Sequence, residues 1–124
     1  MKWQTRETVK RAAANGPKAA LRASIVHWRQ LCRATPEELC EYDNALMTTR
    51  CALCERYYDY GIHDCIESCL LILNGNGCLT GHSAWNEAEL ASFHICSNTL
   101  TTSPEWKRWQ KAAHKMLEVL EGLL

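Results

Sequence analysis

The sequence predicts a small, mainly α-helical domain with a central, zinc-binding cysteine knuckle region. Its 124 residues suit one domain. Apolar residues recur at helical spacing toward both ends, and five of the eight cysteines fall between residues 51 and 78. We therefore expect a single domain over 1–124, with helices over 1–47, a cysteine-rich metal-knuckle segment over 48–82, and two C-terminal helices over 83–124.

Two helices are expected before residue 34. Residues 2–14 are polar with several alanines, and Gly16-Pro17 should end this helix and begin the next, because proline is tolerated in a first helical turn but not in a helix interior. Apolar side chains of the second helix recur on one face, which should enter the core: Leu21, Ile25, Trp28 and Cys32.

Three further helices carry start signals. Thr35 is a candidate cap, with Pro36 at the first helical position and Glu38 placed to close a capping box, which predicts a helix over about 36–47. Ser83 should cap a helix over about 84–96. Ser103-Pro104 should start the last helix, which continues to the C-terminus. That helix is amphipathic, because its apolar residues recur along one face: Trp106, Trp109, Ala113, Met116, Leu117, Leu120 and Leu124.

The central cysteines have spacings typical of a structural zinc site. Cys51 and Cys54 form a CxxC pair, Cys65 and Cys69 are separated by three residues, and Cys78 follows a glycine. Four thiolates hold zinc tetrahedrally and leave no position for a reactive water, so such a site stabilises the fold. Either the first four cysteines bind the metal, or Cys78 replaces one of the later pair. His63 and His82 are reserve ligands. The alternative is that all these thiols only fill a core.

The other three cysteines should lie on helices as small buried hydrophobes: Cys32, Cys40 and Cys96. We expect a cytoplasmic protein, because no long apolar run or secretory signal occurs. A reducing cytosol favours metal binding over disulfides. No catalytic motif accompanies the cysteines, so neither an enzyme nor a small-molecule substrate is expected.

The net charge of zero hides a strong division along the chain. Residues 1–34 carry eight basic side chains against Glu7 alone, and the remainder is acidic by the same net amount. Two helical stripes of these cations would track phosphates, with Trp3 stacking on bases. Solvated faces, or faces turned toward the acidic middle of the chain, are the favoured interpretation of these stripes. The stripes consist of Lys2, Arg6 and Lys10, and of Lys18, Arg22, Arg29 and Arg33.

The chain resembles a loose group of small cysteine-rich proteins encoded by bacteriophages and prophages. The likeness covers about residues 21–124 and rests on these motifs: Ser24-Ile-Val-His-Trp28, Cys51-Ala-Leu-Cys54, Asp64-Cys65 to Cys69, Gly77-Cys78, Ser83-Ala-Trp85 and Trp106-Lys-Arg-Trp109. It implies a phage source and a metal knuckle, with no particular reaction. The chain departs from the group in one respect, since the usual second pair is CxxC followed by proline, and here Leu70 follows a wider pair.

We therefore expect a non-enzymatic phage accessory protein. Its first expected function is to bind and inhibit or modulate a host or bacterial-defence protein, in the manner of an anti-CRISPR protein, through exposed aromatic residues and a polarised surface. The alternative is a small zinc-containing protein that binds nucleic acid through its basic N-terminal helices. A thiol redox or metal-dependent enzyme is the third hypothesis. No membrane partner is expected.

Overall fold

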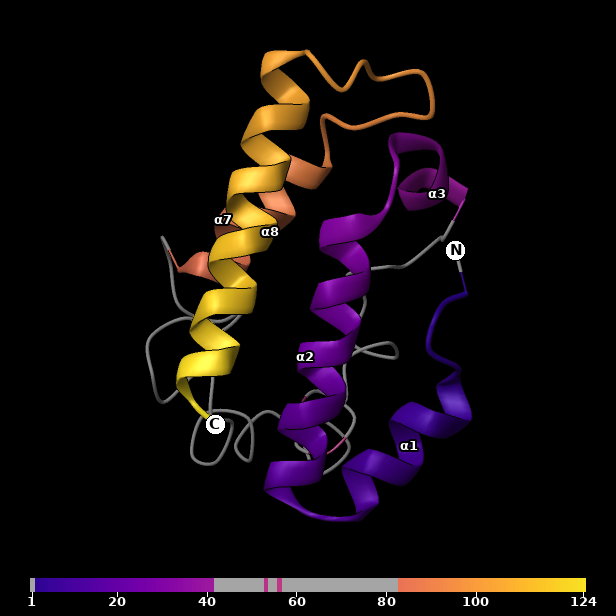
Figure 1. Ribbon diagram of the computed structural model, residues 1–124, viewed down its shortest axis with the longest axis vertical. Helices are drawn as coiled ribbons and strands as arrows, with labels where there is room; N and C mark the ends of the chain where they lie inside the picture. The colour runs from indigo at the N-terminus through magenta and orange to yellow at the C-terminus, as the bar shows by residue number, and fades with distance from the viewer. Residues whose placement is uncertain (1, 42–52, 54–55, 57–82) are drawn as a thin grey trace.

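The described part of the protein is built from helices (Figure 1). The computed structural model describes residues 2–41, 53, 56 and 83–124, and within them we find no strand. The mainly helical prediction is confirmed. The helices are α1 (Arg6–Ala14), α2 (Pro17–Arg33), α3 (Pro36–Glu41), α7 (Ala84–Ser92) and α8 (Pro104–Gly122).

The first helix is shorter than its sequence predicts. It begins at Arg6, after a cap formed by Thr5. The preceding residues are held instead against α2 by the side chain of Gln30, which accepts a hydrogen bond from Gln4 N–H at 3.0 Å and donates one to the Lys2 carbonyl at 2.8 Å. These tertiary hydrogen bonds satisfy backbone groups that a longer helix would have used.

The start signals of the second and third helices are confirmed. Gly16 precedes α2 with a φ of 112°, which glycine adopts without steric cost, and Pro17 occupies the first helical position. At α3 the capping box forms in full. Thr35 Oγ1 accepts from Glu38 N–H at 3.1 Å, and Glu38 Oε1 accepts from Thr35 N–H at 3.0 Å. The predicted continuation of α3 to residue 47 lies outside the described residues.

The last two helices are capped as expected, by Ser83 at α7 and Ser103 at α8. Helix α7, however, ends at Ser92, four residues earlier than predicted. Beyond it the N–H of His94 bonds to the carbonyl of Ala91 at 3.3 Å, three residues back, and the next residue repeats the pattern. This tighter winding is the usual way in which a helix terminates, and it carries the chain away from α7.

The core forms where α2 and α8 lie side by side and antiparallel, with α7 against α8 and α1 against α2 (Figure 1). The rings of Trp28 and Trp109 meet across the α2–α8 interface at a centroid distance of 6.4 Å. Both are buried, as predicted, together with Leu21, Ile25, Trp106, Ala113, Met116 and Leu120. Leu124 was also predicted for this face but is exposed, because α8 has ended before it. Of the described helices, none has the length and apolar character needed to cross a membrane.

Candidate functional site

The five predicted zinc ligands, Cys51, Cys54, Cys65, Cys69 and Cys78, lie outside the described residues, as do His63 and His82. Within the described ranges no group of three or more His, Cys, Asp or Glu side chains is arranged to hold a metal ion. The choice of ligand set therefore stays a prediction.

One described residue fixes where the CxxC pair joins the fold. Leu53, which stands between Cys51 and Cys54 in the sequence, is completely buried. Its N–H donates to the hydroxyl of Ser24, a buried residue of α2, at 3.3 Å. His27, one helical turn further along α2, is also buried. Sequence analysis did not identify Ser24 and His27 as buried polar residues. The indication in the sequence was that both stand on the otherwise apolar side of α2.

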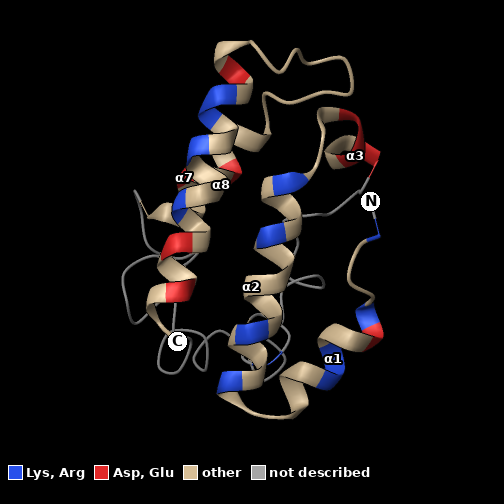
Figure 2. Cartoon of the chain, in the orientation of Figure 1, with Lys and Arg blue, Asp and Glu red and all other residues tan. Residues whose placement is uncertain are grey.

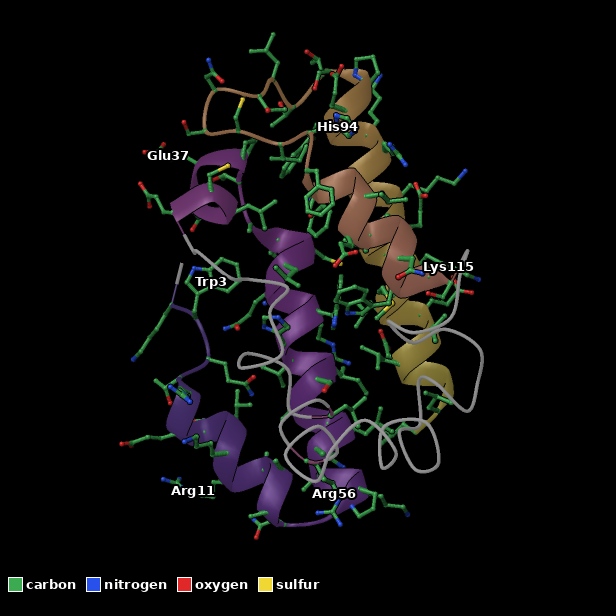
Figure 3. The ribbon with its side chains drawn as sticks, turned by 180° about the vertical axis from the view of Figure 1, so that it is seen from behind. Trp3, Arg11, Glu37, Arg56, His94 and Lys115 are labelled. Carbon is green, nitrogen blue, oxygen red and sulfur yellow. The ribbon has the colours of Figure 1, made fainter. Side chains whose placement is uncertain are left out.

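A second attachment lies just beyond the CxxC pair. The guanidinium of Arg56 donates to the carbonyl of Ala13 at 2.7 Å, in the last turn of α1 (Figure 3). Carbonyls in the last turn of a helix have no partner within the helix and attract cations. Residues 53 and 56 thus tie the start of the cysteine-rich segment to both α1 and α2.

The predicted basic stripe of α2 forms a continuous exposed strip. At 100° per residue, its members lie within a sector of about 60°. All four are exposed, as is Val26 beside them, while the buried residues of α2 occupy the rest of its circumference. We call these side chains the α2 strip: Lys18, Arg22, Arg29 and Arg33.

Most of the α2 strip has no ion-pair partner among the described residues. Arg29 Nη2 lies 3.7 Å from Glu121 Oε2 on α8, and both side chains remain about half exposed, at 49% and 47%. Lys18, Arg22 and Arg33 form no ion pair with any described residue. Surface pairs of the Arg29–Glu121 kind are weak, so an anion of higher charge density would compete effectively for the arginine.

The N-terminal stripe is only partly suited to nucleic acid. Lys2, Arg6 and Lys10 are exposed, but Glu7 lies among them. Trp3 was predicted to stack on bases. It is instead half-buried and packs against the core beside α2, so its ring does not stand free (Figure 3).

Helix α8 adds cations that sequence analysis did not assign. Figure 2 shows basic residues of α2 and α8 in the same view. Lys107 and Lys111 are exposed, whereas Arg108 forms a two-pronged contact with Glu87 of α7 at 2.9 and 3.3 Å. That contact lowers the pKa of Glu87 below its usual range. These residues were overlooked because they belong to the part of the chain that is acidic on average.

Exposed apolar side chains lie on α7 and the connection that follows it. Leu90 and Phe93 are three residues apart and therefore neighbours on one helical face, with exposed fractions of 50% and 71%. Leu100, in the α7–α8 connection, is 70% exposed. Exposed apolar groups of this size are typical of surfaces that contact other proteins.

The three remaining cysteines differ from their prediction. Cys32 on α2 and Cys40 on α3 are half-buried, and burial raises the pKa of the Cys32 thiol to about 11. Cys96 was predicted to be buried on a helix, and this is wrong. It lies beyond the end of α7 and is exposed, because the chain leaves the helix four residues before it.

No protein-family model, curated protein or solved structure matches the chain. The assignment of function therefore depends on the residues described above. Among them the α2 strip has the clearest chemistry, which is the binding of anions.

Proposed function

We propose that this protein is a non-enzymatic nucleic-acid-binding protein that contacts the phosphate backbone through the α2 strip. The observation that carries the proposal is the alignment of Lys18, Arg22, Arg29 and Arg33 on one exposed face, with three of them in no ion pair among the described residues. A nucleic acid is a polyanion whose phosphates follow one another along a line. The four cations of the α2 strip are likewise arranged along a line.

The dimensions of the strip suit a duplex. From Lys18 to Arg33 the helix rises about 22 Å at 1.5 Å per residue, which spans six or seven base pairs at about 3.4 Å each. Lysine and arginine that neutralise phosphates release condensed counterions, and this release provides most of the free energy of sequence-independent binding.

The proposal includes a structural zinc ion held by four of the five clustered cysteines. Thiolates are the ligands that zinc prefers in such sites, and a closed tetrahedral site contributes to folding without catalysing a reaction. The buried Leu53 and its hydrogen bond to Ser24 support this part of the proposal, because they attach to α2 a residue that stands between Cys51 and Cys54 in the sequence. A metal there would stabilise the helix that carries the strip.

Fluorescence anisotropy with a labelled random-sequence DNA duplex tests this function. The Lys18→Ala/Arg22→Ala variant should bind about tenfold or more weakly than the wild type at low salt, because two phosphate contacts are lost. The matched control is Lys107→Ala/Lys111→Ala, which removes the same charge from α8 and should bind within about threefold of the wild type. Equal losses in both variants would show that net charge, and not the strip, governs binding.

A second candidate function is supported by the exposed pair at the end of α7, Leu90 and the capping residue Phe93. We infer that, if the chain is a phage accessory protein, Leu90 and Phe93 would form the contact with a host or bacterial-defence protein that it inhibits. Pull-down from infected bacterial lysate distinguishes the two functions. One stoichiometric protein that is lost with Leu90→Ser/Phe93→Ser supports the inhibitor, whereas bulk nucleic acid lost with Lys18→Ala/Arg22→Ala supports the first proposal.

A further inference from the structure

Helix α3 contacts the α7–α8 connection, and each of the two segments has a cysteine at or next to this contact. Cys40 Sγ donates a hydrogen bond to the carbonyl of Ile95 at 3.5 Å, across 55 positions of sequence. Cys96 follows Ile95 directly, and its Cα is only three covalent bonds from that carbonyl oxygen. The Cys40 sulfur therefore lies beside the backbone of a second, exposed cysteine.

We propose that Cys40 and Cys96 are a thiol pair that closes to a disulfide when the protein meets a disulfide oxidant of low molecular weight. The bond would fasten α3 to the α7–α8 connection. It would also close the loop that contains the cysteine-rich segment.

We expect closure to proceed by a side-chain rotation at Cys96. Its sulfur now lies 2.7 Å from Asn98 Oδ1 and 3.3 Å from Thr99 Oγ1, within its own loop. A disulfide joins cysteines whose Cα atoms are about 4.4–6.8 Å apart. Rotation about the Cα–Cβ bond would exchange the contacts with Asn98 and Thr99 for the Cys40 sulfur, while the contact of Cys40 with Ile95 already holds the two segments together.

The two thiols have different roles in the reaction. Exposed Cys96 reacts first: its thiolate attacks a sulfur of the oxidant, displaces the other half as a thiolate and forms a mixed disulfide. The Cys40 thiolate then attacks the Cys96 sulfur and displaces the second. Overall, the protein thiols lose two protons and two electrons, and the oxidant gains them as two small thiols.

The raised pKa of the Cys40 thiol supports this order. Burial, and after it the nearby Cys96, raises the pKa of Cys40. Because the thiolate is the nucleophile, the closing step should accelerate with rising pH up to that raised pKa.

Oxidised glutathione and peptide mapping provide the test. The full-length protein is incubated with the oxidant at pH 8, its free thiols are blocked by alkylation, and it is digested without reduction. We expect a cross-linked peptide pair that contains Cys40 and Cys96. In Cys40→Ser the glutathione adduct on Cys96 should persist at least about tenfold longer than in the wild type, because the second nucleophile is absent.

Cys32→Ser is the matched control, since it removes a half-buried thiol on another helix, and it should give the same cross-link as the wild type. An adduct on Cys96 that is equally long-lived in the wild type and in Cys40→Ser would overturn the proposal. The proposal would also be overturned if Cys40 or Cys96 formed cross-links to cysteines of residues 51–78 and not to each other.

Discussion

The hydroxyl of Ser24 accepts a hydrogen bond from the backbone N–H of Leu53, and both residues are completely buried. Through this bond α2 serves two purposes on different sides. Its Ser24 side attaches Leu53 to the core, and its α2 strip is exposed. Loss of the bond should therefore reduce stability without changing the charge of the exposed face.

Ser24→Ala tests this relationship. The substitution leaves the N–H of Leu53 buried without an acceptor, which costs about 1–3 kcal/mol of unfolding free energy. Urea denaturation followed by tryptophan fluorescence measures the loss. Ser97→Ala, at an exposed position in the α7–α8 connection, should change stability by less than about 0.5 kcal/mol. Equal stability of the two variants would mean that the bond with Leu53 is unimportant.

Removal of metal should destabilise the whole domain. Native mass spectrometry should give one zinc ion per chain, and a strong chelator should lower the melting temperature, because binding free energy of a structural zinc is folding free energy. Cys51→Ser should abolish the metal, whereas Cys32→Ser, on α2, should retain it. A protein that weighs as bare polypeptide and melts identically with and without chelator has no such site.

Trp109 is a buried side chain whose indole N–H has no hydrogen-bond partner in the described structure. Replacement by alanine should cost about 3–5 kcal/mol, since it removes a large ring from the α2–α8 interface. Replacement by phenylalanine keeps most of the apolar contact with Trp28 and removes the unpaired donor, so we expect a cost below about 1.5 kcal/mol. Thermal denaturation of both variants measures the difference, and similar costs would be inconsistent with an unsatisfied N–H.

The pair between Glu87 and Arg108 predicts a small acid dependence of stability. The hydrogen bond from Arg108 lowers the pKa of Glu87 below its usual 4.5. A group with a lowered folded-state pKa stabilises the fold above its unfolded value and loses that contribution as the pH falls through the folded one. The wild type should therefore melt slightly higher than Glu87→Gln at pH 7, and the difference should begin to shrink below pH 4.5 and vanish only below the lowered pKa of Glu87. A difference that is constant from pH 7 to pH 3 would contradict this origin.

Much of the helical framework was predictable because its signals are local. The capping box formed by Thr35 and Glu38 and the helix cap formed by Ser83 depend only on residues that are close in the sequence. The errors arose where distant residues decide the outcome. Lys2 and Gln4 are held by Gln30 of another helix, and no local pattern announces that contact.

The candidate surface was predictable in part for the same reason. Spacing along α2 was enough to place Lys18, Arg22, Arg29 and Arg33 on one face. The pair of Arg108 with Glu87 was missed, because it depends on how α7 and α8 lie in space. The exposure of Cys96 was missed because it depends on where α7 ends, and amphipathic spacing predicts helix ends poorly.

The salt dependence of duplex binding tests the central claim most directly. If the α2 strip contacts four phosphates, log K should fall against log salt with a slope of about −3.6, and Lys18→Ala/Arg22→Ala should reduce the slope to about −1.8. Lys107→Ala/Lys111→Ala should keep nearly the wild-type slope. A wild-type protein that does not bind the duplex at low salt, or a slope that is unchanged when Lys18 and Arg22 are removed, would contradict the claim that α2 binds nucleic acid.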